Sequence, residues 1–311
     1  MPTVEAQGDG LAVPIDMSAT RGRGLDTSLV LGGGGLYFVA WQVGYLYTAH
    51  QVGIDLGSAA RVVGTSAGSL VATVLCHGRL GWLHAEVSAL AHMPALLSAM
   101  APSTGLSPSQ ERALMLFGEA GDAQPQTVQS IGRAALAAAT QDPARVRGTL
   151  RLIVTARTWP SAALHTTCVD AYTGERCVVN HDSGVRPISA VAASSAVPGI
   201  FPPQPIGDRR CMDGGVSGTG LHLDLVAGAR RSVILSLSDG SNVTEPRMTA
   251  HPGSIEAELA GLTASGTTTF LRTPGALEIA DLMDPAAVPR ALLAGEQQAQ
   301  DDLDELKAFW A

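Results

Sequence analysis

The stretch V-V-G-T-S-A-G-S, residues 62–69, indicates the fold of this chain more clearly than any other. Apolar residues at its start predict a short strand, and the small residues that follow, up to residue 77, predict a helix. A G-x-S-x-G sequence between a strand and a helix is typical of a turn so tight that Gly64 and Gly68 leave no room for side chains. The turn lifts the hydroxyl of Ser66 out of the sheet at a helix start, where the helix dipole favours developing negative charge. Ser66 is therefore predicted to be a nucleophile.

The same order of elements occurs once before, nearer the amino terminus. Residues 29–31 form an apolar run, four glycines follow at 32–35, and residues 36–50 have the aromatic spacing of a packed helix. Two strand–turn–helix units in succession favour a parallel sheet with helices on its faces. We therefore predict an α/β fold, a three-layer α/β/α sandwich with a mainly parallel central sheet.

The rest of the chain continues this fold with one interruption. Residues 82–140 contain no convincing strand and predict a helical insertion, in which residues 90–100 are expected to form a lid rather than an ordinary buried segment. Further strands are predicted at 150–157, 166–170 and 232–238, and further helices at 189–196 and 289–310. Because no linker splits the chain, we expect a flexible amino-terminal lead, residues 1–26, and a single domain, residues 27–311.

The composition excludes several classes of function. Of the 311 residues 46% are hydrophobic and 15% are charged, which indicates a folded globular chain. The formal net charge of −8 makes nucleic acid an unexpected partner. No apolar run reaches the roughly 18 residues of a membrane span, and the first residues lack the apolar core of a signal peptide. The four cysteines form neither a C-x-x-C pair nor a disulfide framework, so we expect a reduced, cytoplasmic protein.

The four glycines at 32–35 form the second stretch that bears on chemistry. Their amides can face an oxyanion without side chains in the way, as acyl transfer requires. A phosphate-binding loop fits less well, because neither G-x-G-x-x-G nor G-K-[ST] occurs there, and a plain tight turn remains open. The serine turn in the next unit favours the oxyanion loop.

A third stretch, C-M-D-G-G at residues 211–215, carries an acidic residue. Taken alone, Asp213 followed by Gly214 and Gly215 favours a turn. The alternative is a general base for Ser66, since partial burial would raise the pKa of the Asp213 carboxyl toward the working range.

In this order, the three stretches resemble the patatin-like phospholipase family, which combines a glycine-rich oxyanion loop, a G-x-S-x-G serine and an aspartate in D-G-[AG]. The segment A-S-S-A-V-P-G-I-F-P-P, residues 193–203, is similar to the block that precedes the family's aspartate. The closing segment, with L-M-D-P at 282–285 and A-G-E-Q-Q at 294–298, is similar to the tail of bacterial members. The resemblance extends from about residue 27 to the carboxyl end.

The resemblance implies a function and a set of roles. Ser66 would be the nucleophile and Asp213 the base of a dyad that needs no histidine, metal or cofactor, and Gly33, Gly34 and Gly35 would form the oxyanion loop. The implied protein is a lipid acyl hydrolase of the phospholipase A type, cytoplasmic or peripheral at a membrane. Its substrate would be a lipid or lipid-like ester, and a transient contact with a membrane surface is left open.

One departure from the family concerns the glycine loop. The family usually has G-G-G-x-[RK]-G, whereas Tyr37 stands here in place of the basic residue and Phe38 in place of the last glycine. The positive charge near the oxyanion or headgroup is therefore missing, which leaves open whether phospholipid is the substrate.

Other classes of function remain open at this point. One is a Ser–His–Asp esterase or thioesterase of the α/β-hydrolase type, because His222 and His251 follow Asp213 in the required order. The apolar neighbours of His222 nevertheless predict a packed or capping position, and His251 precedes a proline in a loop. Another is a catalytically weak, lipid-binding regulatory relative, which the altered glycine loop favours and the intact Ser66 and Asp213 oppose. A metal site is not expected, because spacings such as H-E-x-x-H do not occur.

Overall fold

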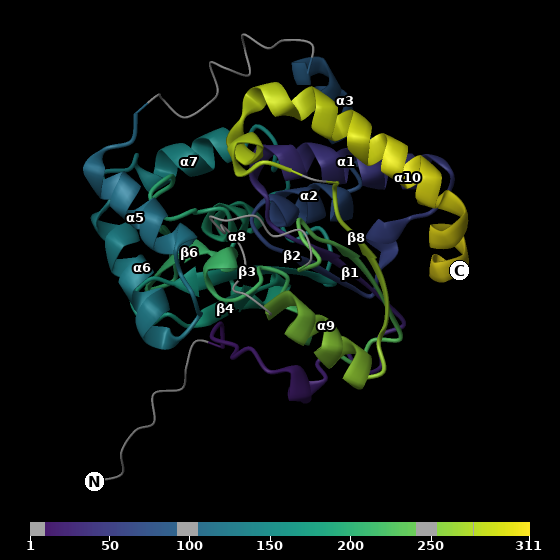
Figure 1. Cartoon of the computed structure of the whole chain (residues 1–311), viewed down its shortest axis with the longest axis horizontal. Helices are drawn as coiled ribbons and strands as arrows, with labels where there is room; N and C mark the ends of the chain where they lie inside the picture. Colours follow the sequence, from purple (N-terminus) through teal and green to yellow (C-terminus); the bar gives the residue numbers. More distant parts are fainter. Residues whose placement is uncertain (1–9, 92–104, 241–253, 276) are drawn as a thin grey trace.

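The computed structural model of the chain describes residues 10–91, 105–240, 254–275 and 277–311. Its centre is one eight-stranded sheet with the strand order β5-β6-β3-β2-β1-β7-β8, and β4 pairs with β3 (Figure 1). The strands are β1 Thr27–Leu31, β2 Arg61–Gly64, β3 Leu164–Asp170, β4 Arg176–Val179, β5 Gln204–Ile206, β6 Arg209–Asp213, β7 Arg231–Leu235 and β8 Thr268–Arg272. Pairing is parallel from β3 through β2, β1 and β7 to β8, and antiparallel where β4, β5 and β6 are added. The predicted mainly parallel sheet is confirmed.

Helices cover both faces of the sheet and complete the predicted three layers. Figure 1 shows α1, α2 and α10 on one face and α9 on the other. The helices are α1 Gly35–Gln51, α2 Ala67–Cys76, α3 Leu80–Ala91, α5 Pro108–Gly118, α6 Pro125–Ala137, α7 Pro143–Leu150, α8 Pro187–Ser194, α9 Ser254–Ala264 and α10 Val288–Trp310. Short 3-10 turns lie at η1 Met17–Ala19, η2 Leu56–Ser58, η3 His181–Ser183, η4 Gly214–Val216, η5 Leu223–Leu225, η6 Ile279–Met283 and η7 Pro285–Ala287. Because β1 is covered on both sides, its apolar residues Leu29, Val30 and Leu31 are all fully buried.

The carboxyl-terminal helix α10 packs against α1 at very short range. A Cβ on Gly295 would lie 2.1 Å from the carbonyl oxygen of Trp41, and one on Gly44 would lie 2.4 Å from that of Leu292. Glycines on both helices therefore let the two backbones approach. The stacked rings of Trp41 and Tyr45, 5.5 Å apart, fill the core beside this contact, as their helical spacing predicts.

The helical insertion is confirmed in the part of the chain that the structure describes, where α3, α5 and α6 occupy residues 82–140. Most of the expected lid, residues 92–100, lies outside the described residues. The strand expected at 150–157 is wrong. Asp142 caps a new helix by accepting a hydrogen bond from the amide of Ala144, α7 runs to Leu150, and the chain then turns with the Leu152 side chain 71% exposed. Val154 is buried in the core, but this segment pairs with no strand that the structure describes, and β3 begins only at Leu164.

The expected flexible lead differs from the structure in its second half. Ala12 forms a bridge to Cys177 of β4, and the amide of Val13 donates to the carbonyl of Arg176 at 2.9 Å. Leu11 is buried in the cluster of apolar side chains beside the hairpin that β3 and β4 form. The segment is held by backbone pairing, a contact that its glycine- and proline-rich composition does not indicate. Residues 1–9 lie outside the described part.

Candidate active site

Ser66 sits on the predicted tight turn between β2 and α2. Its backbone has φ +52° and ψ −121°, in the left-handed region that non-glycine residues rarely enter. The flanking glycines are required by space: a Cβ on Gly68 would lie 2.0 Å from the carbonyl oxygen of Leu31, and one on Gly64 would lie 2.7 Å from that of Gly68. The sequence thus builds a strained turn that presents one hydroxyl at the start of a helix.

Two serines from α8 and its end hold this strained backbone in place. The amide of Ser66 donates to Oγ of Ser194 at 2.9 Å. The carbonyl oxygen of Ser66 accepts hydrogen bonds from Oγ of Ser69 at 2.7 Å and from Oγ of Ser195 at 3.3 Å. Sequence reasoning noted the A-S-S-A segment as part of a resemblance but assigned its serines no contact. Two hydroxyls next to each other at the end of an otherwise apolar helix were the available signal.

The pairing of β3 explains how Asp213 reaches Ser66 across the sheet. Thr166 of β3 pairs with Gly64 on one edge and with Val179 of β4 on the other. Cys168, two residues further on, pairs with Asp213 and again has β4 on its other edge. Strands β2 and β6 therefore share one edge of β3 and run toward each other, so that their carboxyl ends meet. The turn after β2 and the end of β6 are brought together by this geometry.

Thr167, which lies between Thr166 and Cys168 in β3, contacts both the serine turn and the aspartate turn. Oγ1 of Thr167 lies 2.7 Å from Oγ1 of Thr65, which precedes the serine. A Cβ on Gly214 would lie 2.6 Å from the carbonyl oxygen of Thr167, so the aspartate turn also packs on this residue. The amide of Asp213 donates to the carbonyl of Ala196 at 3.0 Å, which links the aspartate to the end of α8.

The Asp213 carboxylate is buried, with 3% of the residue exposed. Oδ1 accepts a hydrogen bond from the amide of Gly215 at 2.8 Å, whereas Oδ2 is buried and makes no hydrogen bond of normal geometry with a described residue. Burial raises the pKa of Asp213 to about 7, against the smaller lowering effects of the Gly215 amide and the Ser66 hydroxyl. The Ser66 hydroxyl is thus close enough to the Asp213 carboxyl to affect its pKa.

The glycine loop between β1 and α1 lies against the serine turn. Gly32 is fixed in the sheet, since its amide donates to Leu235 at 3.0 Å and its carbonyl accepts from the amide of Gly68 at 3.2 Å. A Cβ on Gly33 would lie 3.0 Å from Cβ and 3.7 Å from Oγ of Ser66. The amides of Gly33 and Gly34 donate to no acceptor in the part of the chain that the structure describes.

The last predicted oxyanion glycine packs elsewhere. A Cβ on Gly35 would lie 2.4 Å from the carbonyl oxygen of Leu282, and its φ of +65° also favours glycine. The structure therefore brings Gly33 to Ser66 and packs Gly35 against η6.

The two residues that depart from the family pattern are both aromatic and both buried. Phe38 is fully buried and stacks on Trp41 with ring centres 5.2 Å apart. Tyr37 is 7% exposed and lies under the guanidinium of Arg290, 5.8 Å from the ring centre, and Arg290 is also ion-paired with Asp281. The positive group nearest this end of the loop thus comes from α10 and already has a carboxylate partner.

His222, the candidate for a third catalytic residue, is fully buried behind the aspartate turn. Its Nε2 donates to the carbonyl oxygen of Gly214 at 3.1 Å, and its Nδ1 accepts from Nη1 of Arg176 at 3.5 Å. Burial, with the nearby Arg176 guanidinium, lowers the pKa of His222 to about 3, so the ring stays neutral. Among the described residues no histidine is hydrogen-bonded to Ser66 or Asp213. His251 lies outside them.

Three cysteines form the one described group whose side chains could together hold a metal ion. The sulfur atoms of Cys168, Cys177 and Cys211 lie within 4.8 Å of one another, and all three residues are fully buried. Cys168 and Cys177 are direct partners across the β3–β4 hairpin. Hydrogen bonding to Cys177 and Cys211 and burial hold the pKa of the Cys168 thiol well above its ordinary value, so the cluster is one of neutral core thiols.

The mainly parallel sheet with helices on both faces places the chain in the class of three-layer α/β proteins. Within that class it belongs to the patatin-like phospholipase family, whose model matches residues 29–224. No curated protein matches the chain.

Among solved structures, VipD from Legionella pneumophila is similar at 13% identity and a TM-score of 0.41, over 94% of this chain and 68% of VipD. The type III effector protein ExoU is similar at 16% identity and a TM-score of 0.32, over 94% of this chain and 56% of ExoU. Within the described residues, no helix combines the length and apolar character that crossing a membrane requires.

Proposed function

We propose that this chain is a lipid acyl hydrolase in which Ser66 and Asp213 form a catalytic dyad. Family membership supports the class of reaction. The observation that carries the residue assignment is the meeting of β2 and β6 on one edge of β3, which places a buried carboxylate beside the serine on the strained turn. A carboxylate with a pKa near 7 is partly ionised at neutral pH and basic enough to take a proton there.

In the first half of the proposed reaction, Oδ2 of Asp213 accepts the proton of the Ser66 hydroxyl while Oγ bonds to the acyl carbonyl carbon. The negative charge that develops on the carbonyl oxygen is stabilised by the amides of Gly33, which lies against the serine, and of Gly34. Neither amide has a protein acceptor among the described residues. When the ester C–O bond breaks, the leaving alkoxide takes the proton from Asp213.

In the second half, water attacks the acyl–Ser66 ester. Asp213 accepts a proton from the water molecule as the water oxygen bonds to the acyl carbon. The same glycine amides bind the second oxyanion. Collapse of that intermediate breaks the bond to Oγ and returns the proton to Ser66. The carboxylic acid is released, and the dyad is restored without a histidine.

The substrate is proposed to be an ester with an apolar acyl chain. The aromatic pair Tyr37 and Phe38 gives the loop no free cation, because the guanidinium above Tyr37 is paired with Asp281. We therefore infer that recognition rests more on the acyl chain than on an anionic headgroup. The expected result is comparable hydrolysis of the anionic phosphatidylglycerol and of an uncharged diacylglycerol in mixed micelles, and strong preference for the anionic headgroup would contradict this inference.

The dyad is tested with purified variants and p-nitrophenyl butyrate. Ser66→Ala should lose hydrolysis and labelling by a fluorophosphonate, whereas Ser58→Ala, at an exposed position, should keep both. Asp213→Asn should reduce hydrolysis by at least about a hundredfold, whereas Asp208→Asn, on the exposed turn before β6, should keep it. Labelling that persists in Ser66→Ala would remove Ser66 from the mechanism, and an active Asp213→Asn would remove the dyad.

A further inference from the structure

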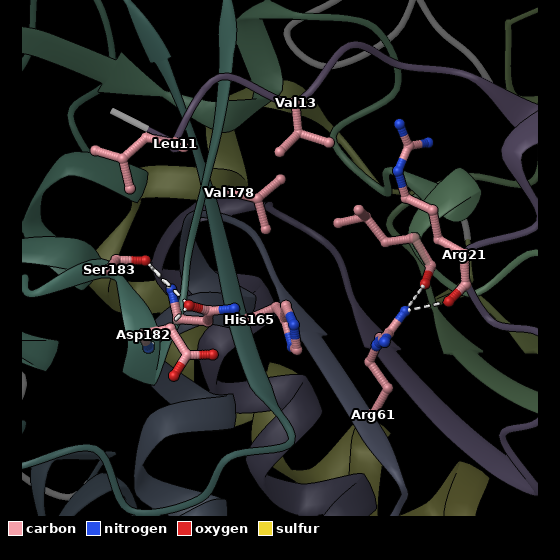
Figure 2. A pocket seen from close by; sticks show the side chains of 11 residues that line it. Leu11, Val13, Arg21, Arg61, His165, Val178, Asp182 and Ser183 are labelled. Atoms are coloured by element: carbon pink, nitrogen blue, oxygen red, sulfur yellow. Dashed lines mark hydrogen bonds between the residues drawn. The ribbon is translucent and has the colours of Figure 1, made fainter. Parts of the chain in front are cut away.

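A second cavity lies at the opposite end of the sheet from Ser66. Arg61 opens strand β2, whose far end leads into the serine turn, and His165 lies near the start of the adjoining β3. Together with the amino-terminal segment, β4 and η3, they enclose a pocket of about 540 Å³ (Figure 2). This volume is within the range of small-molecule sites, and the proposed reaction does not use the pocket.

The Arg61 guanidinium brings a positive charge to this pocket without a carboxylate partner. Its Nη1 donates to the carbonyl oxygens of Arg21, at 2.8 Å, and Leu225, at 2.6 Å, both drawn as dashed lines in Figure 2. Its Nε is buried and has no acceptor, and no ion pair involves Arg61 in the part of the chain that the structure describes. Arg21, which also lines the pocket, is paired with Asp224 at 3.0 Å, and Asp224 is shared with Arg176. Among the described residues, Arg61 is thus the lining guanidinium that has no carboxylate partner.

His165 faces the same space with one ring nitrogen available. Its Nδ1 donates to the carbonyl oxygen of Ala163 at 2.9 Å, which leaves Nε2 without a bonded partner among the described residues. Figure 2 shows the His165 ring and the Arg61 guanidinium on the same side of the pocket, with the guanidinium directed at the carbonyl oxygens of Arg21 and Leu225. A protonated Nε2 would therefore add a second donor to the side of the pocket where the guanidinium lies.

The remaining walls are of two kinds. Leu11, Val13, Val178 and Leu225 contribute apolar surface, and Asn180 and Ser183 add polar groups at the far side. Asp182 also lines the pocket, but its carboxylate is largely exposed and lies 2.9 Å from Nε2 of His181. The pocket thus combines a cationic end with an apolar wall, the lining expected for a small molecule that has an acidic group and a hydrocarbon body.

We propose that this pocket binds a small amphiphilic anion, with its acidic group on Arg61 and His165 and its hydrocarbon body against Leu11, Val13 and Val178. A carboxylate and a phosphate monoester share the required chemistry, because a guanidinium binds either group through charge-assisted hydrogen bonds. The carboxylic acid that hydrolysis would release is one source of such a ligand, and a phosphorylated alcohol is the other. The site is separate from the dyad, so its occupancy does not depend on whether Ser66 is catalytic.

Binding is measured by calorimetry on the Ser66→Ala protein with hexanoate, hexyl phosphate and hexanol. Both anions should bind and hexanol should not, and the tighter anion identifies the source. Arg61→Gln should weaken binding by about tenfold or more, whereas the matched change Arg151→Gln, at an exposed position outside the pocket, should leave it unchanged. Amide exchange should show protection at residues 10–13 and 176–183 when the ligand is bound.

The pH dependence separates this site from the dyad. Burial lowers the pKa of His165, with Arg61 and His181 acting in the same direction and the Ala163 carbonyl and Asp182 against it. A bound anion favours the protonated ring, so binding should tighten by about fivefold from pH 8 to pH 5.5, and this gain should vanish in His165→Gln.

Arg61→Lys, which keeps the charge, covers the case in which Arg61→Gln does not fold. Equal binding of hexanol and hexanoate, or binding unaffected by Arg61→Gln and Arg61→Lys alike, would overturn the proposal.

Discussion

The buried carboxyl of Asp213 should make the folded protein less stable as pH rises, and Asp213→Asn should remove that dependence. Burial raises the pKa of this group from 3.8 to about 7. Between these two values the folded state holds a proton that the unfolded state has released, so the stability contribution is largest below the lower value and is lost as pH rises through the window. Each pH unit inside the window changes the free energy of unfolding by about 1.4 kcal/mol.

From about pH 5 to about pH 7 the wild type should therefore lose between about 2 and 3 kcal/mol relative to Asp213→Asn. The hydrogen bond from the Gly215 amide to Oδ1 can be kept by the asparagine oxygen, so the variant preserves the turn. Denaturant unfolding of both proteins at several pH values gives the difference directly, and groups common to both proteins cancel. The same ionisation should appear as a rise of kcat/KM with a midpoint near 7 in the wild type.

Two results would refute this reasoning. Unfolding free energies that stay parallel from about pH 5 to about pH 8 would show that Asp213 titrates alike in both states. A midpoint near 4 in kcat/KM would show that the carboxylate is solvated in the free enzyme. Asp208→Asn, which changes an exposed carboxyl, provides the matched control, and its stability curve should follow that of the wild type.

Three further substitutions test the supports of the site. Gly68→Ala should cost more than about 4 kcal/mol or prevent folding, because its Cβ would meet a strand carbonyl at 2.0 Å, whereas Gly148→Ala, in open space, should be tolerated in denaturant unfolding. Ser194→Ala removes the hydroxyl that binds the amide of the nucleophile and should slow fluorophosphonate labelling by about tenfold with little change in KM. His222→Phe should lower kcat and shift the pH–rate midpoint that reports Asp213, yet leave slow labelling, whereas complete loss of labelling would favour a catalytic histidine.

The parts of the fold that the sequence predicts are those set by local spacing. The turn around Ser66 needs glycine two residues before and two residues after the serine, and the local sequence G-T-S-A-G shows this requirement directly. Helix α1 and helix α10 follow from apolar periodicity, and α10 begins at Val288, one residue before the expected proline. The strand expected at 150–157 fails because a capping aspartate and a proline at 142–143 start a helix that extends to Leu150, and residues 151–153 then form a turn.

What local spacing does not contain is the pairing that assembles the site. Nothing in residues 164–170 indicates that β3 pairs with three other strands and that two of them share one edge. The contact of Ser194 is not indicated by local spacing either, since its hydroxyl accepts a hydrogen bond from the Ser66 amide across 128 positions of sequence. Such contacts are tertiary, and neither local spacing nor the resemblance to a family indicated them.

The D-G-G segment, residues 213–215, can be a turn and also carry the proposed general base. As a turn, the segment is held by Oδ1 of Asp213, which accepts from the amide of Gly215 and so fixes the orientation of the carboxylate. That bond occupies one oxygen and leaves Oδ2 buried, without a partner of normal geometry and beside the Ser66 hydroxyl. The hydrogen bond that makes this segment a turn would therefore also orient Oδ2 for the proposed proton transfer. Residue pattern alone reports the turn, because the burial that raises the pKa of the carboxyl comes from the sheet around it.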